Sequence, residues 1–192
     1  MRNWAVSGGK RLFDAALAGM GLLLFAAPLA FFSWQIRRRL GNPVFFRQER
    51  VGRGGRHFTI LKFRTMMEKG EVPPGFSRWL RDTAMDELPQ MLNILLGEMS
   101  FVGPRPLIPE ELGELERVPG GTRRLEPRPG LAGLAQLASD KTPSLEERVR
   151  LDLEYVDRAS LGMDLRILFQ SVRVTLRGAW ERPGPKVEPK KG

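Results

Sequence analysis

The chain has 192 residues, enough for one domain with a core of its own, and a second independent domain is not expected. It has 31 lysines and arginines against 22 acidic residues, and the resulting formal charge of +9 predicts an anionic partner, which could be nucleic acid, an anionic lipid surface or a phosphorylated substrate. It contains no cysteine, which excludes disulfides, thiolate metal sites and cysteine nucleophiles. Any covalent chemistry must therefore use oxygen or nitrogen.

A long uncharged segment near the N-terminus has the composition of a membrane element. Residues 15–34 carry no charged side chain. About 20 apolar residues are the usual length of a helix that crosses a bilayer core of about 30 Å. The run is too long for the apolar part of a secretory signal peptide, and no clear small-residue cleavage site ends it. The segment therefore belongs in lipid.

Two features favour a segment that enters the bilayer and returns. Basic residues flank both ends, Lys10 and Arg11 before it and residues 37–39 after it, whereas positive charge normally favours one side of a membrane. Pro28 lies within the run and lacks the amide that would bond one turn back, so a kink is expected there. A re-entrant helix–break–helix over residues 11–38 fits both features. From these residues alone, an ordinary spanning helix stays open as the alternative.

Two β-rich runs follow the apolar segment. PVFFRQ and HFTILKFRTM are separated by the glycine-rich VGRGGR, which predicts a β-hairpin that must pack on another element. Alternation in the second run places Lys62 and Arg64 side by side on one face. These two cations are typical either of a solvated edge strand protected by charge, which is the commoner case, or of an anion site.

An acid pair precedes the next predicted helix. In TAMDELPQMLNIL, Asp86 and Glu87 come directly before Pro89, a favoured first-turn residue, and the helix is expected to end at Gly97. Acids in this position usually complement the helix dipole and satisfy its free amides. The common interpretation of such a pair is therefore a helix cap.

Arginines surround this acid pair and support a chemical interpretation. Arg81 precedes it in the short helix candidate SRWLRDT, Arg105 lies in a proline-rich loop, and Arg128 lies in the Pro/Gly segment EPRPGLAGLAQL. Such a set suits phosphoryl transfer, in which a carboxylate attacks phosphorus while Mg²⁺ and arginines hold the negative charge of the transition state. Carboxylate oxygens favour Mg²⁺ or Mn²⁺ over zinc. The single histidine, His57, is interpreted as structural, and VGRGGR matches no nucleotide-binding fingerprint.

The C-terminal part is predicted to contain two helices and a tail. Ser144, with Glu147 three residues on, forms a capping-box pattern that begins a charged surface helix. In residues 164–178, apolar side chains recur at helical spacing while arginines lie elsewhere on the wheel. This pattern indicates either a core-packed helix, which is commoner, or a basic amphipathic helix on a membrane. Residues 183–192 are predicted to be a basic disordered tail.

Four motifs occur in a fixed order along the chain: KFRTM, LR-x-T-x-x-DELPQ, N-x-L-x-GEMSFVGPRP and RPGLAGLAQL. Their ordered combination is highly specific and resembles the bacterial sugar transferase family, the monotopic phosphoglycosyl transferases. The resemblance covers residues 10–178. The chain length is similar to that of the small members, which are little more than the catalytic unit.

The resemblance implies transfer of a sugar-1-phosphate from a UDP-sugar to a polyprenol phosphate, with release of UMP, as the first membrane step of glycoconjugate synthesis. Asp86 would be the nucleophile that forms a phosphosugar-aspartyl intermediate and would bind Mg²⁺, while Glu87 would assist. The substrate phosphates would be held by Lys62, Arg64, Arg81, Arg105 and Arg128.

The resemblance also implies a fold and a location. The expected fold is α+β, mainly α, in a single monotopic catalytic domain over residues 1–182. It would combine a re-entrant membrane helix–break–helix that breaks at Pro28, a short β-hairpin, and a cytosolic helical catalytic unit over residues 41–182 with interfacial amphipathic helices. The expected location is the inner leaflet of the cytoplasmic membrane, with the catalytic unit facing the cytosol.

The chain departs from the family pattern at two places. Ala27 stands before the breaking proline where many members have serine, so a hydroxyl that could bond the broken backbone is missing. After RPGLAGLAQ the chain continues with LASDKTP instead of an Asn-Gly-Arg-Asn type of sequence, so sugar specificity is the least transferable inference. Asp164 matches a frequent family pattern and is interpreted either as a functional residue or as a cap.

Two other classes of function compete with the enzyme. One is a noncatalytic monotopic scaffold that binds anionic lipid through residues 37–39 and the C-terminal helix. The other is a membrane-anchored nucleic-acid-binding protein, but the aromatic platforms of a single-strand groove are not arrayed on the predicted strands. A nucleic-acid partner is therefore not expected, and no pattern in the sequence selects the sugar or the oligomeric state.

Overall fold

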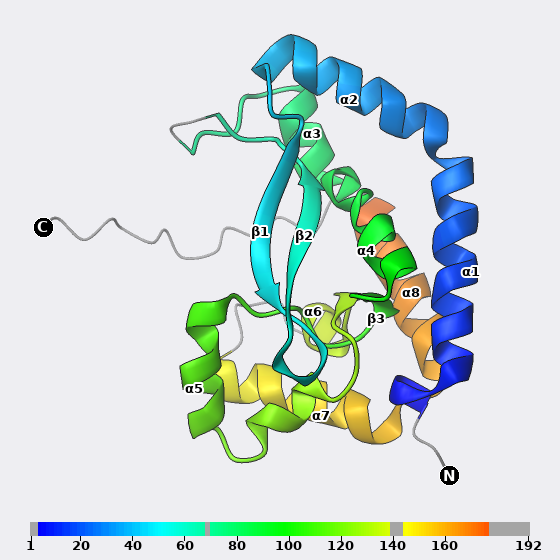
Figure 1. Cartoon of the computed structure of the whole chain (residues 1–192), viewed down its shortest axis with the longest axis vertical. Helices are drawn as coiled ribbons and strands as arrows, with labels where there is room; N and C mark the ends of the chain where they lie inside the picture. The colour runs from blue at the N-terminus through cyan, green and yellow to red at the C-terminus, as the bar shows by residue number, and fades with distance from the viewer. Residues whose placement is uncertain (1–3, 68–69, 139–143, 177–192) are drawn as a thin grey trace, which may run out of the picture.

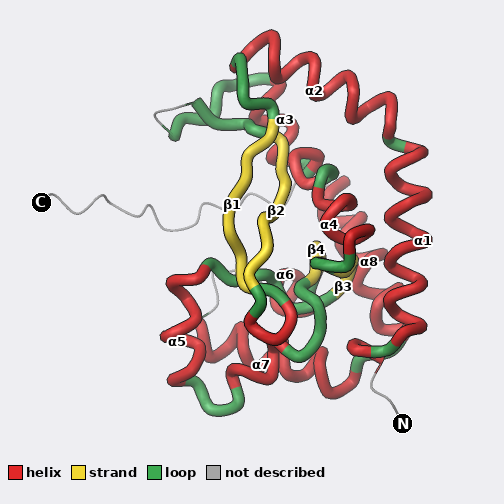
Figure 2. Tube along the Cα trace, viewed as in Figure 1, coloured by secondary structure: helices red, strands yellow, loops and turns green. Residues whose placement is uncertain are grey.

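The computed structural model describes residues 4–67, 70–138 and 144–176, and these form a mainly helical domain with two small sheets (Figures 1 and 2). The expected α+β class is confirmed. The predicted tail and most of the LASDKTP segment lie outside the described residues. In chain order, the elements are α1 (Gly8–Leu24), α2 (Ala26–Leu40), β1 (Phe45–Val51), β2 (His57–Phe63), α3 (Phe76–Asp82), α4 (Gln90–Leu96), β3 (Ser100–Val102), α5 (Leu112–Arg117), β4 (Gly130–Ala132), α6 (Leu134–Ala138), α7 (Leu145–Arg158) and α8 (Leu161–Leu176).

The apolar N-terminal segment forms α1 and α2, which follow one side and one end of the molecule and meet at a bend of 63° (Figure 1). The break lies at Phe25, before Pro28, which occupies the first turn of α2. A proline removes the hydrogen bond to the carbonyl four residues back and crowds that carbonyl, so the helix breaks upstream of the proline and not at it. Among the described residues, no single helix is long and apolar enough to cross a bilayer. The bent pair of α1 and α2 is long and apolar enough only when the two helices are taken together.

The predicted hairpin is confirmed, because β1 and β2 pair antiparallel over their whole length (Figure 2). The glycine-rich segment forms a tight 3₁₀ turn, Arg53–Gly55, in which both glycines have positive φ (63° and 78°). Ile60 lies in the main core with Ile94 of α4, and Phe63 packs edge-on against Phe32 of α2. Two strands alone are marginally stable, so these helices stabilise the hairpin.

A short parallel pair, β3 with β4, was not predicted from the sequence. It brings the GPRP and RPGLAG motifs side by side. The approach requires glycine, because a Cβ on Gly130 would lie 2.1 Å from the amide nitrogen of Gly103, and one on Gly103 would lie 2.5 Å from the carbonyl oxygen of Arg128. The prolines and glycines of these motifs predict loops, so the sequence did not indicate these two strands, each of which has only three residues.

Asp164, in the first turn of α8, is fully buried and joins several elements. Its carboxylate accepts hydrogen bonds from Lys10 Nζ at 2.6 Å, from Trp4 Nε1 at 2.8 Å and from the Tyr155 hydroxyl at 2.8 Å. Lys10 belongs to α1 and Tyr155 to α7. Asp164 therefore acts neither as a helix cap nor in the acid-pair site, but fastens α1 to the C-terminal helices.

The apolar stripe of α8 faces outward. Leu165, Phe169 and Val172 are 50%, 63% and 56% exposed, whereas Asp164 and Ile167 are buried. The core-packed interpretation is therefore wrong for these three residues, although Leu168 of the same stripe packs against the main core. Asp164 lies on the other face of α8, and its hydrogen bonds to α1 and α7 hold that face against the rest of the molecule. Most of the apolar stripe is therefore left on the surface.

Candidate active site

The acid pair occupies an irregular turn between α3 and α4. Ala84 has a left-handed backbone (φ 53°), Met85–Glu87 form a 3₁₀ turn, and α4 begins after Pro89. A left-handed conformation costs a residue with a Cβ roughly 1–2 kcal/mol, so the surrounding packing must hold the turn. In the described part of the chain, the carboxylates of Asp86 and Glu87 accept no hydrogen bond from a backbone amide of α4, so the pair does not cap that helix.

Lys62 and Glu87 form a direct ion pair between β2 and this turn. Lys62 Nζ lies 2.5 Å from Glu87 Oε1, and the two side chains are only 19% and 22% exposed. Burial by itself would raise the pKa of Glu87, but the charges of Lys62 and Arg105 outweigh burial and hold that pKa below its ordinary value. Glu87 is therefore an anion at neutral pH, and Lys62 does not serve as the solvated charge of an edge strand.

Asp86 has the opposite electrostatic character. Burial, and next the neighbouring charge of Glu87, raise the pKa of Asp86 to about 6, although Lys62 and Arg81 act to lower it. Its carboxylate forms no ion pair with any described residue. Two adjacent acids whose pKa values are shifted in opposite directions are typical of acids with different chemical roles.

The loop after β3 presents Arg105 to the same site. Arg105 is exposed and lines a small pocket together with Lys62 and Glu87. Its backbone carbonyl accepts a hydrogen bond of 3.0 Å from Arg124 Nη2. Arg124 is itself buried and lies 2.6 Å from the buried carboxylate of Asp152. The Arg124–Asp152 ion pair therefore fixes the backbone that carries Arg105.

Arg50 of β1 lines this pocket as well, and it was not among the residues predicted from the sequence. It donates a hydrogen bond of 3.3 Å to the carbonyl of Pro106, and burial together with the charge of Arg105 lowers its pKa. The register of the hairpin contains the signal that could have identified Arg50. Alternation continued from β2 into β1 places Arg50 on the face that carries Ile60 and Lys62.

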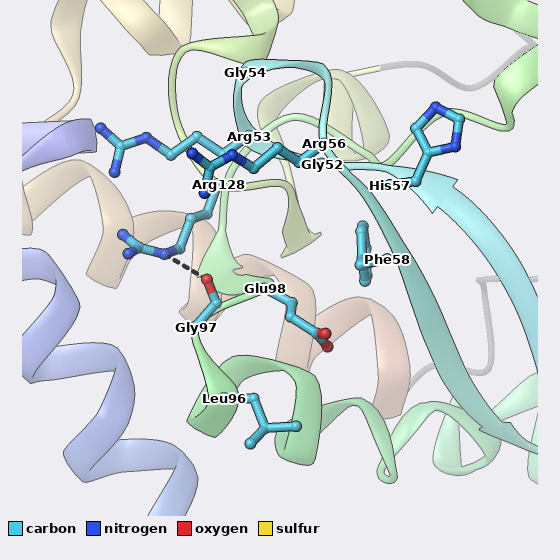
Figure 3. A pocket seen from close by; sticks show the side chains of 10 residues that line it. All are labelled: Gly52, Arg53, Gly54, Arg56, His57, Phe58, Leu96, Gly97, Glu98 and Arg128. Atoms are coloured by element: carbon cyan, nitrogen blue, oxygen red, sulfur yellow. Dashed lines mark hydrogen bonds between the residues drawn. The ribbon is translucent and has the colours of Figure 1, made fainter.

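Two predicted phosphate-binding arginines lie apart from the acid pair. Arg64 donates hydrogen bonds to the backbone carbonyls of residues 40–42 and so closes the end of α2. Because β2 ends at Phe63, strand alternation no longer fixes the direction of Arg64. Arg128 donates a hydrogen bond of 2.7 Å to the carbonyl of Gly97 and lines a different pocket at the hairpin tip (Figure 3).

The donor groups of the acid-pair turn fit a magnesium ion. Mg²⁺ is usually bound by one or two carboxylates and completed by substrate phosphates and water. Asp86 and Glu87 supply two adjacent carboxylates, and among the described residues no cluster of three or more acidic or histidine side chains offers a fuller set. The raised pKa of Asp86 indicates negative charge that a divalent cation would stabilise.

An acid pair beside a lysine and several arginines, on a small α+β domain, is typical of enzymes that act on phosphate-bearing substrates. Comparison with known families gives the particular class. A model of the bacterial sugar transferase family matches residues 5–178, and the chain belongs to this family. The resemblance inferred from the four motifs is confirmed, and the protein is a transferase enzyme.

Curated relatives are similar over most of the chain. The uncharacterized sugar transferase EpsL of Bacillus subtilis is 40% identical over 177 residues, which cover 87% of each protein. The UDP-glucose:undecaprenyl-phosphate glucose-1-phosphate transferase of Caulobacter vibrioides is 36% identical over 186 residues, 88% of this chain and 70% of that protein. The undecaprenyl-phosphate galactose phosphotransferase of Salmonella typhimurium is 35% identical over 196 residues, 88% of this chain and 40% of that protein.

Proposed function

We propose that the protein transfers a sugar-1-phosphate from a UDP-sugar to a polyprenol phosphate and releases UMP. The observation that carries this proposal is the acid-pair turn, where Asp86 has no ion-pair partner among the described residues and lies beside Glu87, Lys62 and Arg81. The names of the Caulobacter and Salmonella relatives support it, since both specify undecaprenyl phosphate, with glucose in one name and galactose in the other. The sugar is therefore a property to be measured for this chain.

In the first half-reaction, a carboxylate oxygen of Asp86 attacks the phosphorus that carries the sugar. A bond forms between this oxygen and phosphorus, the bond from phosphorus to the bridging oxygen breaks, and its electron pair leaves with UMP. Lys62, Arg50 and Arg105 line the adjacent pocket, where their positive charges would stabilise the phosphate oxygens. The step requires ionised Asp86, and its pKa of about 6 leaves the group mostly ionised at pH 7–8.

In the second half-reaction, an oxygen of the polyprenol phosphate attacks the same phosphorus. The bond from phosphorus to Asp86 breaks, and the free carboxylate is restored. The two substrates thus react in turn with the same group, which predicts ping-pong kinetics. Glu87 stays anionic throughout, because its ion pair with Lys62 holds its pKa low, and it fixes the position of the lysine beside the phosphates.

We propose Mg²⁺ as the cofactor, held by Asp86 with assistance from Glu87. When bound, it would supply positive charge to the substrate phosphates and to the leaving UMP. Lys62 pairs with Glu87, and Arg105 lines the same pocket, so two positive charges lie beside the carboxylate that would assist the ion. Chelation of divalent cations is therefore expected to abolish UMP release without unfolding the protein, as measured by circular dichroism.

We also propose that α1 and α2 form a re-entrant membrane segment, with the catalytic part on the cytosolic face of the inner membrane. Support comes from Leu12, Leu23 and Leu24 of α1, which are 72%, 81% and 73% exposed, and from the exposed apolar stripe of α8. The chain has no cysteine, so single cysteines at Gly8 and Arg37 can be labelled selectively. Labelling of both from the cytosolic side is expected, and labelling from opposite sides would establish a spanning helix.

The reaction is tested by UMP release from a panel of UDP-sugars in the presence of polyprenol phosphate and Mg²⁺. The matched control is Asp86→Asn, which keeps the size of the side chain and removes its nucleophilic oxygen pair. Release with one or a few sugars, absent from the variant, would support the proposal and identify the sugar. No release across a broad panel, from folded protein in lipid nanodiscs, would favour the noncatalytic scaffold.

A further inference from the structure

A second basic pocket lies at the tip of the hairpin. It encloses about 440 Å³ between the hairpin turn, the end of α4 and the segment before β4 (Figure 3). Arg53, Arg56 and Arg128 line it. It shares no lining residue with the pocket that contains Lys62 and Glu87, so it is a separate feature of the molecule.

Guanidinium groups from three parts of the chain gather at this pocket. Arg128 donates a hydrogen bond of 2.7 Å to the carbonyl of Gly97, the left-handed residue that ends α4. Arg11 of α1 lies 3.4 Å from the position that a Cβ on Gly97 would occupy, and it donates to two carbonyls in the last turn of α4. Arg53 at the hairpin tip donates a hydrogen bond of 3.0 Å to the carbonyl of Glu126.

These backbone contacts hold the three guanidinium groups in place without neutralising their charge. Within the described residues, no carboxylate forms an ion pair with Arg11, Arg53 or Arg128. Glu98 lines the pocket, but its carboxylate accepts a hydrogen bond of 2.7 Å from Asn93 and points away from Arg128 (Figure 3). Burial, followed by the charges of Arg53 and Arg11, lowers the pKa of Arg128. A bound anion would relieve this repulsion.

We propose that the hairpin-tip pocket is a second site, apart from Asp86, that binds a phosphate group. The fork of a guanidinium matches phosphate oxygens, and each of these arginines keeps N–H groups that its backbone bonds do not use. Leu96 lines the pocket and is 73% exposed, which gives the site an apolar border. The phosphate can belong to the headgroup of an anionic phospholipid or to a soluble compound, and the test separates these two sources. The proposal does not depend on catalytic turnover.

The test measures binding of two probes to the full-length protein in neutral detergent with EDTA, which removes any divalent cation that could bridge a phosphate to the acid-pair turn. One probe is inorganic pyrophosphate. The other is dihexanoyl phosphatidylglycerol, with dihexanoyl phosphatidylcholine as its zwitterionic control. Arg53→Gln removes one exposed guanidinium from the pocket, and Arg117→Gln removes an exposed one from α5, which matches the change in net charge.

We expect saturable binding of at least one anionic probe, roughly tenfold weaker in Arg53→Gln because a charge-assisted phosphate contact is lost, and changed less than about twofold in Arg117→Gln. Tighter binding of phosphatidylglycerol would assign the site to a lipid headgroup, and tighter binding of pyrophosphate would assign it to a soluble phosphate. Four results would overturn the proposal: no binding of either probe, equal binding of the zwitterionic lipid, equal weakening by both variants, or unchanged binding by Arg53→Gln.

Discussion

Replacement of Asp86 by asparagine is expected to stabilise the fold while it abolishes transfer. Asparagine has nearly the shape of a neutral aspartate and carries no charge beside Glu87. The pKa of Asp86 is raised from 3.8 to about 6. A shift of roughly two units corresponds to about 3 kcal/mol against the ionised form in the folded state. Asp86 is partly exposed, so solvent screens some of this electrostatic cost. We therefore expect Asp86→Asn to be more stable than the wild type by about 1–3 kcal/mol above pH 7.

The pH dependence of this difference is its signature. Because the folded-state pKa of Asp86 lies above the unfolded one, ionisation disfavours the folded protein, and the wild type loses stability relative to Asp86→Asn as the pH rises from about 4 to about 6. The two proteins should be equally stable below this window and differ by a constant amount above it. Thermal unfolding in neutral detergent with EDTA measures the difference.

A matched variant should behave in the opposite way. The pKa of Glu87 is lowered in the folded protein, so its ionised form contributes stability at neutral pH that falls away in acid. Glu87→Gln is therefore expected to destabilise the protein at pH 8. An Asp86→Asn protein that is no more stable than the wild type at pH 8 would refute the electrostatic description of the acid pair.

Three further substitutions test the parts around the site. Arg124→Lys keeps a positive charge beside the buried Asp152 but loses the guanidinium hydrogen bond to the carbonyl of Arg105. KM for the UDP-sugar should therefore rise about tenfold. An equal rise in the exposed control Arg123→Lys would contradict this. Gly130→Ala should cost at least about 3 kcal/mol in chemical denaturation because its methyl would meet backbone, whereas Gly113→Ala, with open space around it, should be tolerated; normal stability of Gly130→Ala would contradict the close approach. Arg64→Gln should lower the unfolding free energy by about 1–2 kcal/mol with little change in KM, and a raised KM with normal stability would assign Arg64 to phosphate binding instead.

The features that could be predicted depend on residues close together in the sequence. The side chain of Ser144 accepts the amide hydrogen of Glu147 at 3.2 Å and caps α7 as expected. Gly97 ends α4 in the left-handed conformation (φ 85°), and the glycine-rich turn joins the two strands of the hairpin. Each of these signals is complete within a few residues, so no knowledge of the rest of the fold was needed.

The features that were missed depend on contacts between distant segments. The β3–β4 pair exists because the backbones of Gly103 and Gly130 meet, and no local pattern indicates that they do. The inner face of α8 was decided by the partners of Asp164 on α1 and α7, so the more apolar stripe was left outside. Hydrophobic periodicity shows that a helix has two faces, but it does not show which face a neighbour covers.

The candidate site was predicted only in part, because its residues come from segments that are distant in the sequence. The motifs located Asp86, Glu87 and Lys62, and the structure brings the last two into contact. Arg50 became visible only through the register of the hairpin. Arg128 is the first residue of the RPGLAGLAQL motif, but its side chain is directed to the end of α4, which no sequence pattern specifies.

A phosphosugar adduct on Asp86 is the most direct test of the proposed mechanism. The protein is incubated with Mg²⁺ and a UDP-sugar that supports UMP release, without polyprenol phosphate, and is then analysed by intact-protein and peptide mass spectrometry. We predict the added mass of one sugar phosphate, located on the peptide that contains Asp86, absent from Asp86→Asn and lost when polyprenol phosphate is added. Absence of any adduct, together with strictly sequential kinetics in a preparation that turns over, would contradict the covalent mechanism.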